Sequence, residues 1–246
     1  MRKALSVVYL FYAAIIFISL MLIAFPLVLL ISFLLPGLTG KKIILVCLRA
    51  WAFLFSCLSF FWVVTHGKQH IDHKRPHIYV GNHGSYLDAV AVCLCIPQHF
   101  FALGKIEMTK VPVFGMIYKR IVVMIDRSSA ESRAHSVQIL KEEIAIGQSI
   151  LIFPEGTMNK TNEPLSEFYD GAFRIAIQTQ TPILPFVMVN GKNLLPRTNP
   201  LKARPGIIKV MMLPAIEVEG LTESDIPALK EKTYQIMYNA LLSEAT

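Results

Sequence analysis

Residues 77–96 read HIYVGNHGSYLDAVAVCLCI, a short β-type run that passes through a polar loop into a second apolar run. Ser85 and Asp88 have the S-x-x-D spacing of a capping box, which predicts a helix beginning at Tyr86. A strand that leads through a short loop into a helix is the repeating unit of α/β domains. The neighbouring sequence shows whether this unit is repeated.

The chain beyond residue 66 repeats the alternation of strands and helices. Its clearest helical patterns are 130–146, which Ser128 or Ser129 can cap, and about 225–242. The alternation predicts an α/β fold, with a central, mostly parallel (mixed) sheet flanked by helices. The expected strands are 77–81, 99–103, 121–125, 149–153, 183–189 and 207–213.

Two apolar segments, about 5–35 and 43–65, precede this domain. They raise the hydrophobic content to 54% and the mean hydropathy to +0.50, both high for a soluble protein. The first segment exceeds the roughly 20 residues that span a bilayer, and it is too long for a cleaved signal peptide. We therefore expect residues 1–65 to form a membrane-embedded hairpin of two helices and residues 66–246 to form the α/β domain.

Basic residues at both ends of the first apolar segment favour a re-entrant hairpin. Short loops that carry Lys or Arg prefer the cytoplasmic side of a membrane, and here both ends carry them. A hairpin that enters one leaflet and returns satisfies both ends, and Pro26 allows a kink within it. Two ordinary spanning helices are the alternative. The basic residues are Arg2, Lys3, Lys41 and Lys42.

The net charge of +7 does not indicate a nucleic-acid partner, because it is concentrated around the apolar segments. Residues 1–65 hold five basic residues and no acidic one, whereas the other 19 basic residues are nearly balanced by 17 acidic ones. Charges placed in this way suit an anionic lipid surface. Cys93 and Cys95 form a lone C-x-C, so we expect free thiols, no metal site and a reducing compartment.

His83 and Asp88 can form a base and the group that orients it. A helical turn near Ser85 can return the Asp88 carboxylate to the imidazole, which fixes the tautomer and leaves the other ring nitrogen to accept a proton. The octapeptide GNHGSYLD alone also fits a capped helix that follows a loop histidine. A Ser85–His83–Asp88 triad is disfavoured, because the G-x-S-x-G elbow is absent from this stretch.

A turn that follows another expected strand, FPEGT at 153–157, is suited to an anion. Gly156 allows the main chain to present N–H groups and Thr157 adds a hydroxyl, a combination that binds phosphate or carboxylate. Glu155 would repel an anion. We therefore expect it to pair with a cation or to hold the loop by accepting main-chain N–H bonds.

Lys105 and Arg127 also follow expected strands. Ligands of parallel α/β sheets bind beyond the C-terminal ends of the strands. We therefore expect these two side chains at the same edge of the sheet as His83 and Glu155. Four polar features at one edge indicate a functional site more specifically than any of them alone.

Taken in order, these stretches resemble four sequence blocks of the glycerolipid acyltransferases, and specifically of the bacterial 1-acylglycerol-3-phosphate (lysophosphatidic acid) acyltransferases. The first block has the H-x-x-x-x-D spacing. The resemblance covers about residues 80–190, and the N-terminal apolar appendage is also similar to that of the family. The blocks are NHGSYLD at 82–88, GK…VPVFG…IDR at 104–127, FPEGT at 153–157 with GAF at 171–173, and TPILPFVM at 181–188.

The resemblance implies a membrane-bound enzyme that moves a fatty acyl group from an acyl thioester to the free glycerol hydroxyl of lysophosphatidate, giving phosphatidate. His83 would be the base and Asp88 its orienting group, with no covalent acyl-enzyme, cofactor or metal. The donor would be an acyl carrier protein or coenzyme A thioester. The setting would be the cytoplasmic face of a bacterial inner membrane, with its phospholipid and lysophospholipid as partners. The acceptor-phosphate site would include Lys105, Arg127, Glu155, Gly156 and Thr157.

One position departs from the family pattern, in which Arg follows EGT as a phosphate contact; here Met158 follows it. Loss of a bidentate cation from a phosphate site costs about 1.5–3 kcal/mol unless another cation replaces it. Either Arg127, Lys160 or Arg174 compensates, or the acceptor is a lyso-aminolipid that needs less positive charge. A basic run without acidic residues faces anionic lipid, an acidic acyl carrier protein or only solvent. It comprises Lys192, Arg197, Lys202, Arg204 and Lys209.

Two other classes of protein fit parts of this pattern. A catalytically silent lipid-binding protein would share the fold, but the intact His83–Asp88 pair argues against it. A hydrolase would use Ser85 as its nucleophile, but Ser85 is better placed to cap a helix. Substitution of His83 separates the first class from an enzyme, and substitution of Ser85 tests the second.

Overall fold

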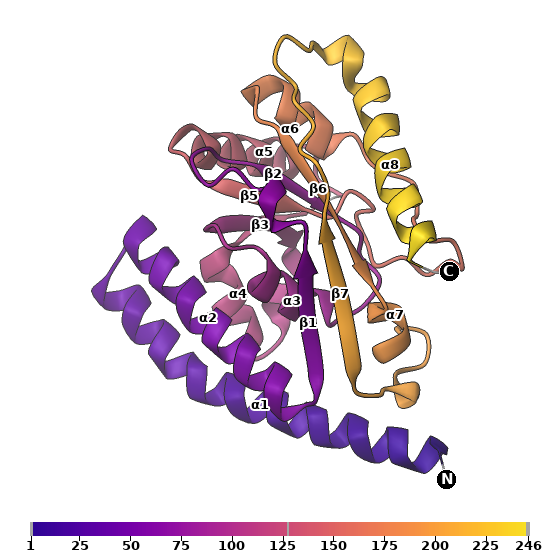
Figure 1. Ribbon diagram of the computed structural model, residues 1–246. Helices are drawn as coiled ribbons and strands as arrows, with labels where there is room; N and C mark the ends of the chain where they lie inside the picture. Colours follow the sequence, from indigo (N-terminus) through magenta and orange to yellow (C-terminus); the bar gives the residue numbers. More distant parts are fainter. Residues whose placement is uncertain (1, 127, 245–246) are drawn as a thin grey trace.

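The computed structural model describes residues 2–126 and 128–244, in which seven strands form one mixed sheet flanked by helices (Figure 1). The strand order is β1-β7-β6-β2-β5-β3-β4, and β6–β7 is the antiparallel pair among otherwise parallel neighbours. The predicted α/β class with a mostly parallel sheet is confirmed. The strands are β1 (Phe61–His66), β2 (Ile78–Gly81), β3 (Phe100–Lys105), β4 (Val122–Ile125), β5 (Ser149–Ile152), β6 (Ile183–Val189) and β7 (Gly206–Met212).

Helices cover both faces of the sheet (Figure 1). The pattern at 130–146 is confirmed as α5, where the Ser129 hydroxyl accepts the N–H of Ser132 as an N-cap. The helices are α1 (Arg2–Leu34), α2 (Leu38–Leu58), α3 (Asp88–Cys95), α4 (Phe114–Ile121), α5 (Ala130–Ala145), α6 (Gly171–Thr179), α7 (Gly191–Leu194) and α8 (Ile226–Ser243). Short 3₁₀ turns are η1 (Lys68–His70), η2 (Ile106–Lys110), η3 (Pro200–Lys202) and η4 (Glu223–Asp225).

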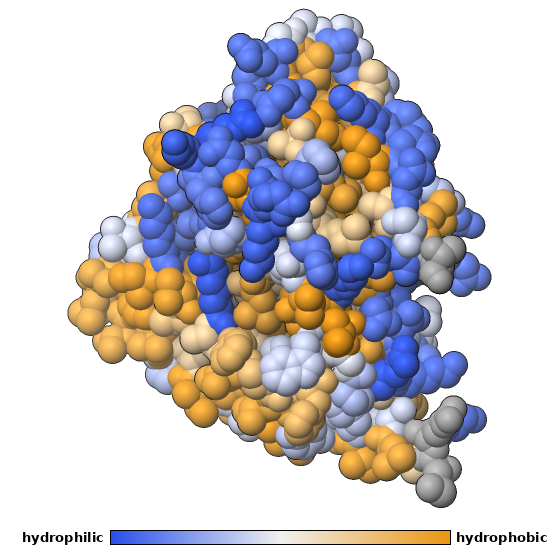
Figure 2. All heavy atoms as spheres, in the orientation of Figure 1, coloured by the Kyte–Doolittle hydropathy of each residue, from blue (hydrophilic) through white to orange (hydrophobic). Residues whose placement is uncertain are grey.

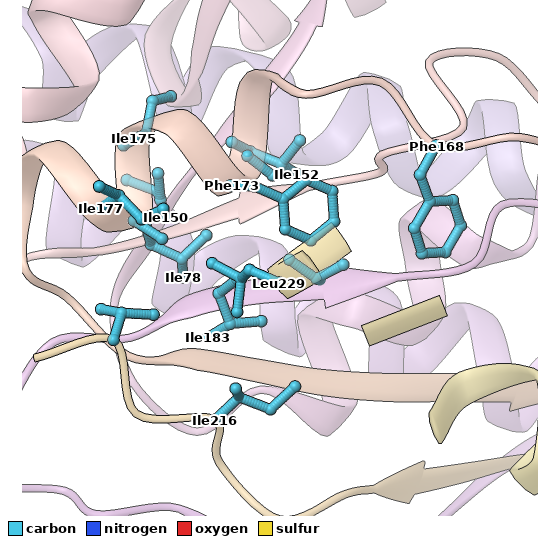
Figure 3. Close-up of a cluster of buried hydrophobic side chains, with 14 of the residues drawn as sticks. Ile78, Ile150, Ile152, Phe168, Phe173, Ile175, Ile177, Ile183, Ile216 and Leu229 are labelled. Atoms are coloured by element: carbon cyan, nitrogen blue, oxygen red, sulfur yellow. The ribbon is translucent and has the colours of Figure 1, made fainter. Parts of the chain in front are cut away.

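Alternate residues of the central strands build a core on each side of the sheet. Ile78 and Val80 of β2 face a core shared with α5, α6 and α8, whereas Tyr79 faces one shared with α2 and α3. Figure 3 shows Phe173 of α6 and Leu229 of α8 packed with strand isoleucines of the first core. Strands buried on both faces read as continuous apolar runs, which explains why the sequence reveals them.

We expected the second apolar segment to be one helix to residue 65, and this prediction is wrong. Its helix, α2, ends at Leu58, and the following residues form strand β1, which pairs in parallel with β7. Phe60 has a φ of 54°, so the chain turns sharply between the two elements. Trp62 therefore lies in a strand, and the expected boundary between residues 65 and 66 falls inside the sheet.

Helices α1 and α2 pack against each other and form an apolar flank of the molecule. Figure 2 shows an extended apolar surface in the region that α1 and α2 occupy in Figure 1. Helix α1 is long and apolar enough over Lys3–Leu34 to cross a membrane, as judged by length and composition. The embedding of this pair in a membrane stays a prediction.

Contacts with the α/β domain are made near both ends of α1. Helix α1 contacts η3, and near its start the Tyr9 hydroxyl donates to the main-chain oxygen of Ser59, the C-cap residue of α2, at 2.7 Å. Toward its end, Val28 packs with Ile117 of α4. Just beyond the turn into α2, Lys41 Nζ lies 3.1 Å from Glu143 Oε1 of α5. The helix therefore lies along the side of the domain.

Candidate active site

The sheet brings three loops together beside His83. Strand β2 lies between β5 and β6, and these three strands are parallel, so their C-terminal ends meet at one edge. The loop after β2 carries His83, the loop after β5 carries Glu155, and the connection after β6 runs through α7 to β7. This edge is where parallel α/β sheets bind ligands.

His83 and Asp88 form a hydrogen-bonded pair. Their Nδ1 and Oδ2 atoms are 2.9 Å apart, and Oδ2 also accepts the main-chain N–H groups of Gly84 and Ser85, each at 2.8 Å. Asp88 is buried, and its Oδ2 already serves as the acceptor of two main-chain N–H bonds. Nδ1 of His83 therefore carries the proton in this pair, which leaves Nε2 available as a base.

The His83 ring is partly exposed and is fixed by stacking. Its centroid lies 4.5 Å from that of Phe153, with the two rings 16° from parallel. The side chain of His83 keeps 22% of its surface exposed, whereas that of Asp88 keeps only 2%. The imidazole can thus meet a substrate while its partner stays out of water.

Glu155 holds the main chain of the His83 loop. Its Oε1 accepts the N–H of His83 at 2.7 Å, and its Oε2 accepts the N–H of Ser166 at 2.8 Å. The expectation that this carboxylate accepts main-chain N–H bonds is confirmed. Burial raises the pKa of Glu155, and the bonds from His83 and Ser166 oppose that shift. On the other side, the N–H of Asn159 donates to the carbonyl oxygen of His83 at 2.7 Å.

We expected Ser85 to cap a helix that begins at Tyr86, but the helix begins later. Helix α3 begins at Asp88. The Ser85 hydroxyl accepts the N–H of Leu87 at 3.3 Å and donates to the main-chain oxygen of Leu195 at 3.2 Å. Ser85 is fully buried. Over the described ranges, no hydrogen bond joins its hydroxyl to His83, so the geometry lacks the nucleophile–base contact of a triad.

The FPEGT turn is present, and Gly156 closes it; binding of an anion by main-chain N–H groups of this turn stays a prediction. The N–H of Gly156 donates to the Phe153 oxygen at 3.0 Å and closes the turn, for which Gly156 adopts a φ of 68°. Thr157 is exposed at the tip, and its Oγ1 accepts from Arg197 Nη1 at 3.4 Å. The turn therefore offers a hydroxyl and a bound guanidinium.

Of the expected cations, Lys105 lies on a strand that does not neighbour the strand before His83. Lys105 is the exposed last residue of β3, and β5 separates that strand from β2. No ion pair or hydrogen bond is recorded for the Lys105 side chain within the described part of the chain. Arg127 lies outside the described residues. Arg174, named as a compensating cation, lies 3.7 Å from Glu223.

The connection between β6 and β7 supplies two cations that sequence spacing did not single out. The stem of Lys192 crosses the His83 loop so closely that a Cβ at Gly84 would lie 2.7 Å from Lys192 Cγ. Arg197 Nη1 donates to the main-chain oxygen of Met158 at 3.0 Å, beside its contact with Thr157. Only their membership of a basic run pointed to these residues.

The acyltransferase family model matches residues 63–189. Mouse 1-acyl-sn-glycerol-3-phosphate acyltransferase alpha is 29% identical over 183 residues, which cover 71% of this chain and 62% of the mouse protein. The 1-acyl-sn-glycerol-3-phosphate acyltransferase of Cocos nucifera is 34% identical over 151 residues, covering 61% and 48%. The chain thus spans about half to three fifths of the length of these relatives.

The fold is similar to that of the 1-acyl-sn-glycerophosphate (LPA) acyltransferase PlsC from Thermotoga maritima. The two structures match with a TM-score of 0.83 at 21% sequence identity. The match covers 100% of this chain and 98% of that one, so it includes the N-terminal helices as well as the sheet.

Proposed function

Because the chain belongs to the acyltransferase family, we propose that it transfers a fatty acyl group from an acyl thioester to the free glycerol hydroxyl of lysophosphatidate, giving phosphatidate. The observation that carries the proposal is the His83–Asp88 pair, whose Nε2 is left to accept a proton. The names of the relatives support the choice of acceptor.

In the proposed reaction, the hydroxyl oxygen of the acceptor attacks the thioester carbonyl carbon. His83 Nε2 takes the hydroxyl proton, the new ester bond forms, and the C–S bond breaks as the proton passes to the leaving thiolate. Asp88 keeps the imidazole in the required tautomer and stabilises the imidazolium. A positioned base of this kind contributes about 10²- to 10⁴-fold to the rate.

Direct transfer without an acyl-enzyme is supported by the position of Ser85. Its hydroxyl is buried and bonded to Leu195, so the acceptor's own hydroxyl is the better nucleophile for His83 to activate. A thioester is already an activated acyl donor, and we infer acyl carrier protein or coenzyme A as its thiol. The reaction as written uses neither a cofactor nor a metal.

We place the α1–α2 pair of the 1–65 segment in one leaflet of the membrane. Helix α1 contacts η3 and α4 of the α/β domain, the latter through Val28, and Lys41 in the first turn of α2 pairs with Glu143. If α1 spanned the bilayer, its two ends would lie on opposite sides of a hydrocarbon core about 30 Å thick. One end would then be too far from the domain to make these contacts. The domain would lie on the cytoplasmic face of a bacterial inner membrane.

A panel of acceptors tests the function. The purified chain in detergent is given an acyl thioester with either lysophosphatidate or a lyso-aminolipid, the second acceptor class that Met158 favours. We expect turnover of lysophosphatidate, with one thiol released for each phosphatidate formed. Turnover of the lyso-aminolipid alone would overturn the assignment of the acceptor. Lipid binding without any turnover would favour a silent binding protein.

Ser85→Ala is the control for a hydrolase. It removes a buried hydroxyl but no contact of His83, so acyl transfer should persist. Loss of transfer in a folded Ser85→Ala protein would contradict the direct mechanism.

A further inference from the structure

We propose that Arg197 and Lys192, both in the connection between β6 and β7, bind the phosphate group of the acceptor lipid. This inference rests on the proposed function and names the cations that recognise its substrate. The site would replace the positive charge that Met158 lacks at the FPEGT turn.

Arg197 is anchored where the FPEGT turn ends. Its Nη1 donates to the main-chain oxygen of Met158 at 3.0 Å and to Thr157 Oγ1 at 3.4 Å. A guanidinium has five N–H donors, so these bonds leave others for a ligand. Among the residues that the structure describes, no carboxylate pairs with Arg197, so its charge is not neutralised within the protein.

Lys192 is held beside the His83 loop. Its Nζ donates to the main-chain oxygen of Glu163 at 3.2 Å, and its stem passes over Gly84, next to His83. Burial lowers the pKa of Lys192, and the nearby carboxylates of Glu155 and Asp88 oppose the shift. A half-buried ammonium that donates to a neutral carbonyl is stabilised when an anion comes beside it.

The charges around His83 show why cations are needed. Asp88 and Glu155 are buried carboxylates, and both are already occupied by main-chain N–H bonds. They would repel a phosphate monoester, which carries nearly two negative charges at neutral pH. Lys192 and Arg197 offset that repulsion from the connection that faces them.

The connection is fixed to the His83 loop at several points, so its cations are held in place. The Ser85 hydroxyl donates to Leu195 between the two cations. At Gly191, an added Cβ would lie 3.1 Å from Asp88 Oδ1, which shows how closely the connection approaches the pair. Both cations therefore move with the loops that carry the base.

Arg197→Ala tests the proposal with two acceptors, lysophosphatidate and monoacylglycerol, which lacks the phosphate. A lost charge-assisted contact is worth about 10- to 100-fold, so the acceptor KM should rise by that factor for lysophosphatidate while the donor KM stays unchanged. The preference for lysophosphatidate over monoacylglycerol should fall by the same factor. Lys192→Met, which keeps the stem that crosses Gly84, should act in the same direction.

Met158→Arg in the Arg197→Ala background is the rescue, because the main chain of residue 158 accepts the shorter of the two bonds from Arg197. We expect it to restore the preference for lysophosphatidate. Arg204→Ala is the matched control in the same connection, since its Nε donates to the Asn193 oxygen rather than to the FPEGT turn, and it should leave the acceptor KM unchanged. Arg197→Gln removes the charge but keeps a polar side chain. A raised acceptor KM with an unchanged thermal unfolding temperature indicates a binding defect, whereas a lowered unfolding temperature indicates misfolding.

Three outcomes would overturn the inference. One is an unchanged acceptor KM in a folded Arg197→Ala protein. Another is an equal loss of activity on both acceptors, which would indicate a general defect. The third is a wild-type chain that does not acylate lysophosphatidate, a result that would overturn the proposed function and, with it, this inference.

Discussion

Helix α1 exposes apolar side chains, whereas the site around His83 buries charged ones. Helix α1 exposes large apolar side chains, with Ile23 at 71% and Phe33 at 84%, whereas Asp88 and Glu155 are each only 2% exposed. Soluble enzymes normally bury large apolar side chains and expose carboxylates. The contrast teaches that bulk water is the natural surrounding of neither region. Main-chain N–H groups solvate the carboxylates, and lipid would solvate the helix.

The largest expected effect is that of His83→Ala on turnover. The variant removes the base, so kcat should fall about 10²- to 10⁴-fold. The loop should survive, because Glu155 and Asn159 bind the main chain of residue 83 rather than its side chain. Turnover and thermal unfolding measured together check this, and near wild-type kcat in the variant would contradict the role of the base.

The next effect concerns the other region, where Ile23→Glu places a charge on the apolar flank of α1. Withdrawal of one large apolar side chain from lipid costs about 1.5–3 kcal/mol, so binding to liposomes should weaken about 10- to 100-fold. Flotation of the protein with vesicles measures it. Leu242→Glu on α8 makes a similar change away from α1 and α2, and equal losses in both variants would refute a specific lipid contact.

Glu155→Gln is expected to lower the free energy of unfolding more than it lowers the rate of the reaction. The new amide can accept one of the two main-chain N–H bonds but turns a donor toward the other, and an unsatisfied buried donor costs about 1–3 kcal/mol. Denaturant unfolding should show this loss in the free energy of unfolding. An unchanged midpoint would mean that the loop is held without the carboxylate.

The smallest effect is expected for Lys41→Met in the first turn of α2. The change removes a partly exposed ion pair with Glu143 but keeps an apolar stem near the Phe101 ring, so stability should fall by less than about 1 kcal/mol. Lys230→Met, which removes the pair with Asp170, is the matched control. A much larger loss for Lys41→Met in denaturant unfolding would show that charge fixes α1 to the domain.

The fold was predictable where local sequence and packing agree. Strand β6 was expected at its observed bounds, because a strand covered on both faces has a continuous apolar run. Strand β1 was missed for the same reason, since Phe61–His66 prolongs an apolar segment and periodicity does not separate a buried strand from a helix end. Only its pairing with β7, far along the chain, makes it a strand.

The candidate site divides in the same way. The contact between His83 and Asp88 follows from their spacing, because one turn returns the carboxylate to the ring. The positions of Lys192 and Arg197 do not, because they depend on β6 lying next to β2 and on the path of a long connection. Long-range placement of this kind leaves no pattern in neighbouring residues.

Helix α1 also contacts η3, in the same connection that carries Lys192 and Arg197. The surface that would rest on lipid and the cations that would receive the headgroup are therefore mechanically joined. A lysophospholipid could diffuse to them in the plane of the leaflet with its chain still immersed. For such an enzyme, the meaningful concentration is two-dimensional. Diluting the acceptor with inert lipid at constant bulk amount should then slow the reaction as effectively as removing acceptor.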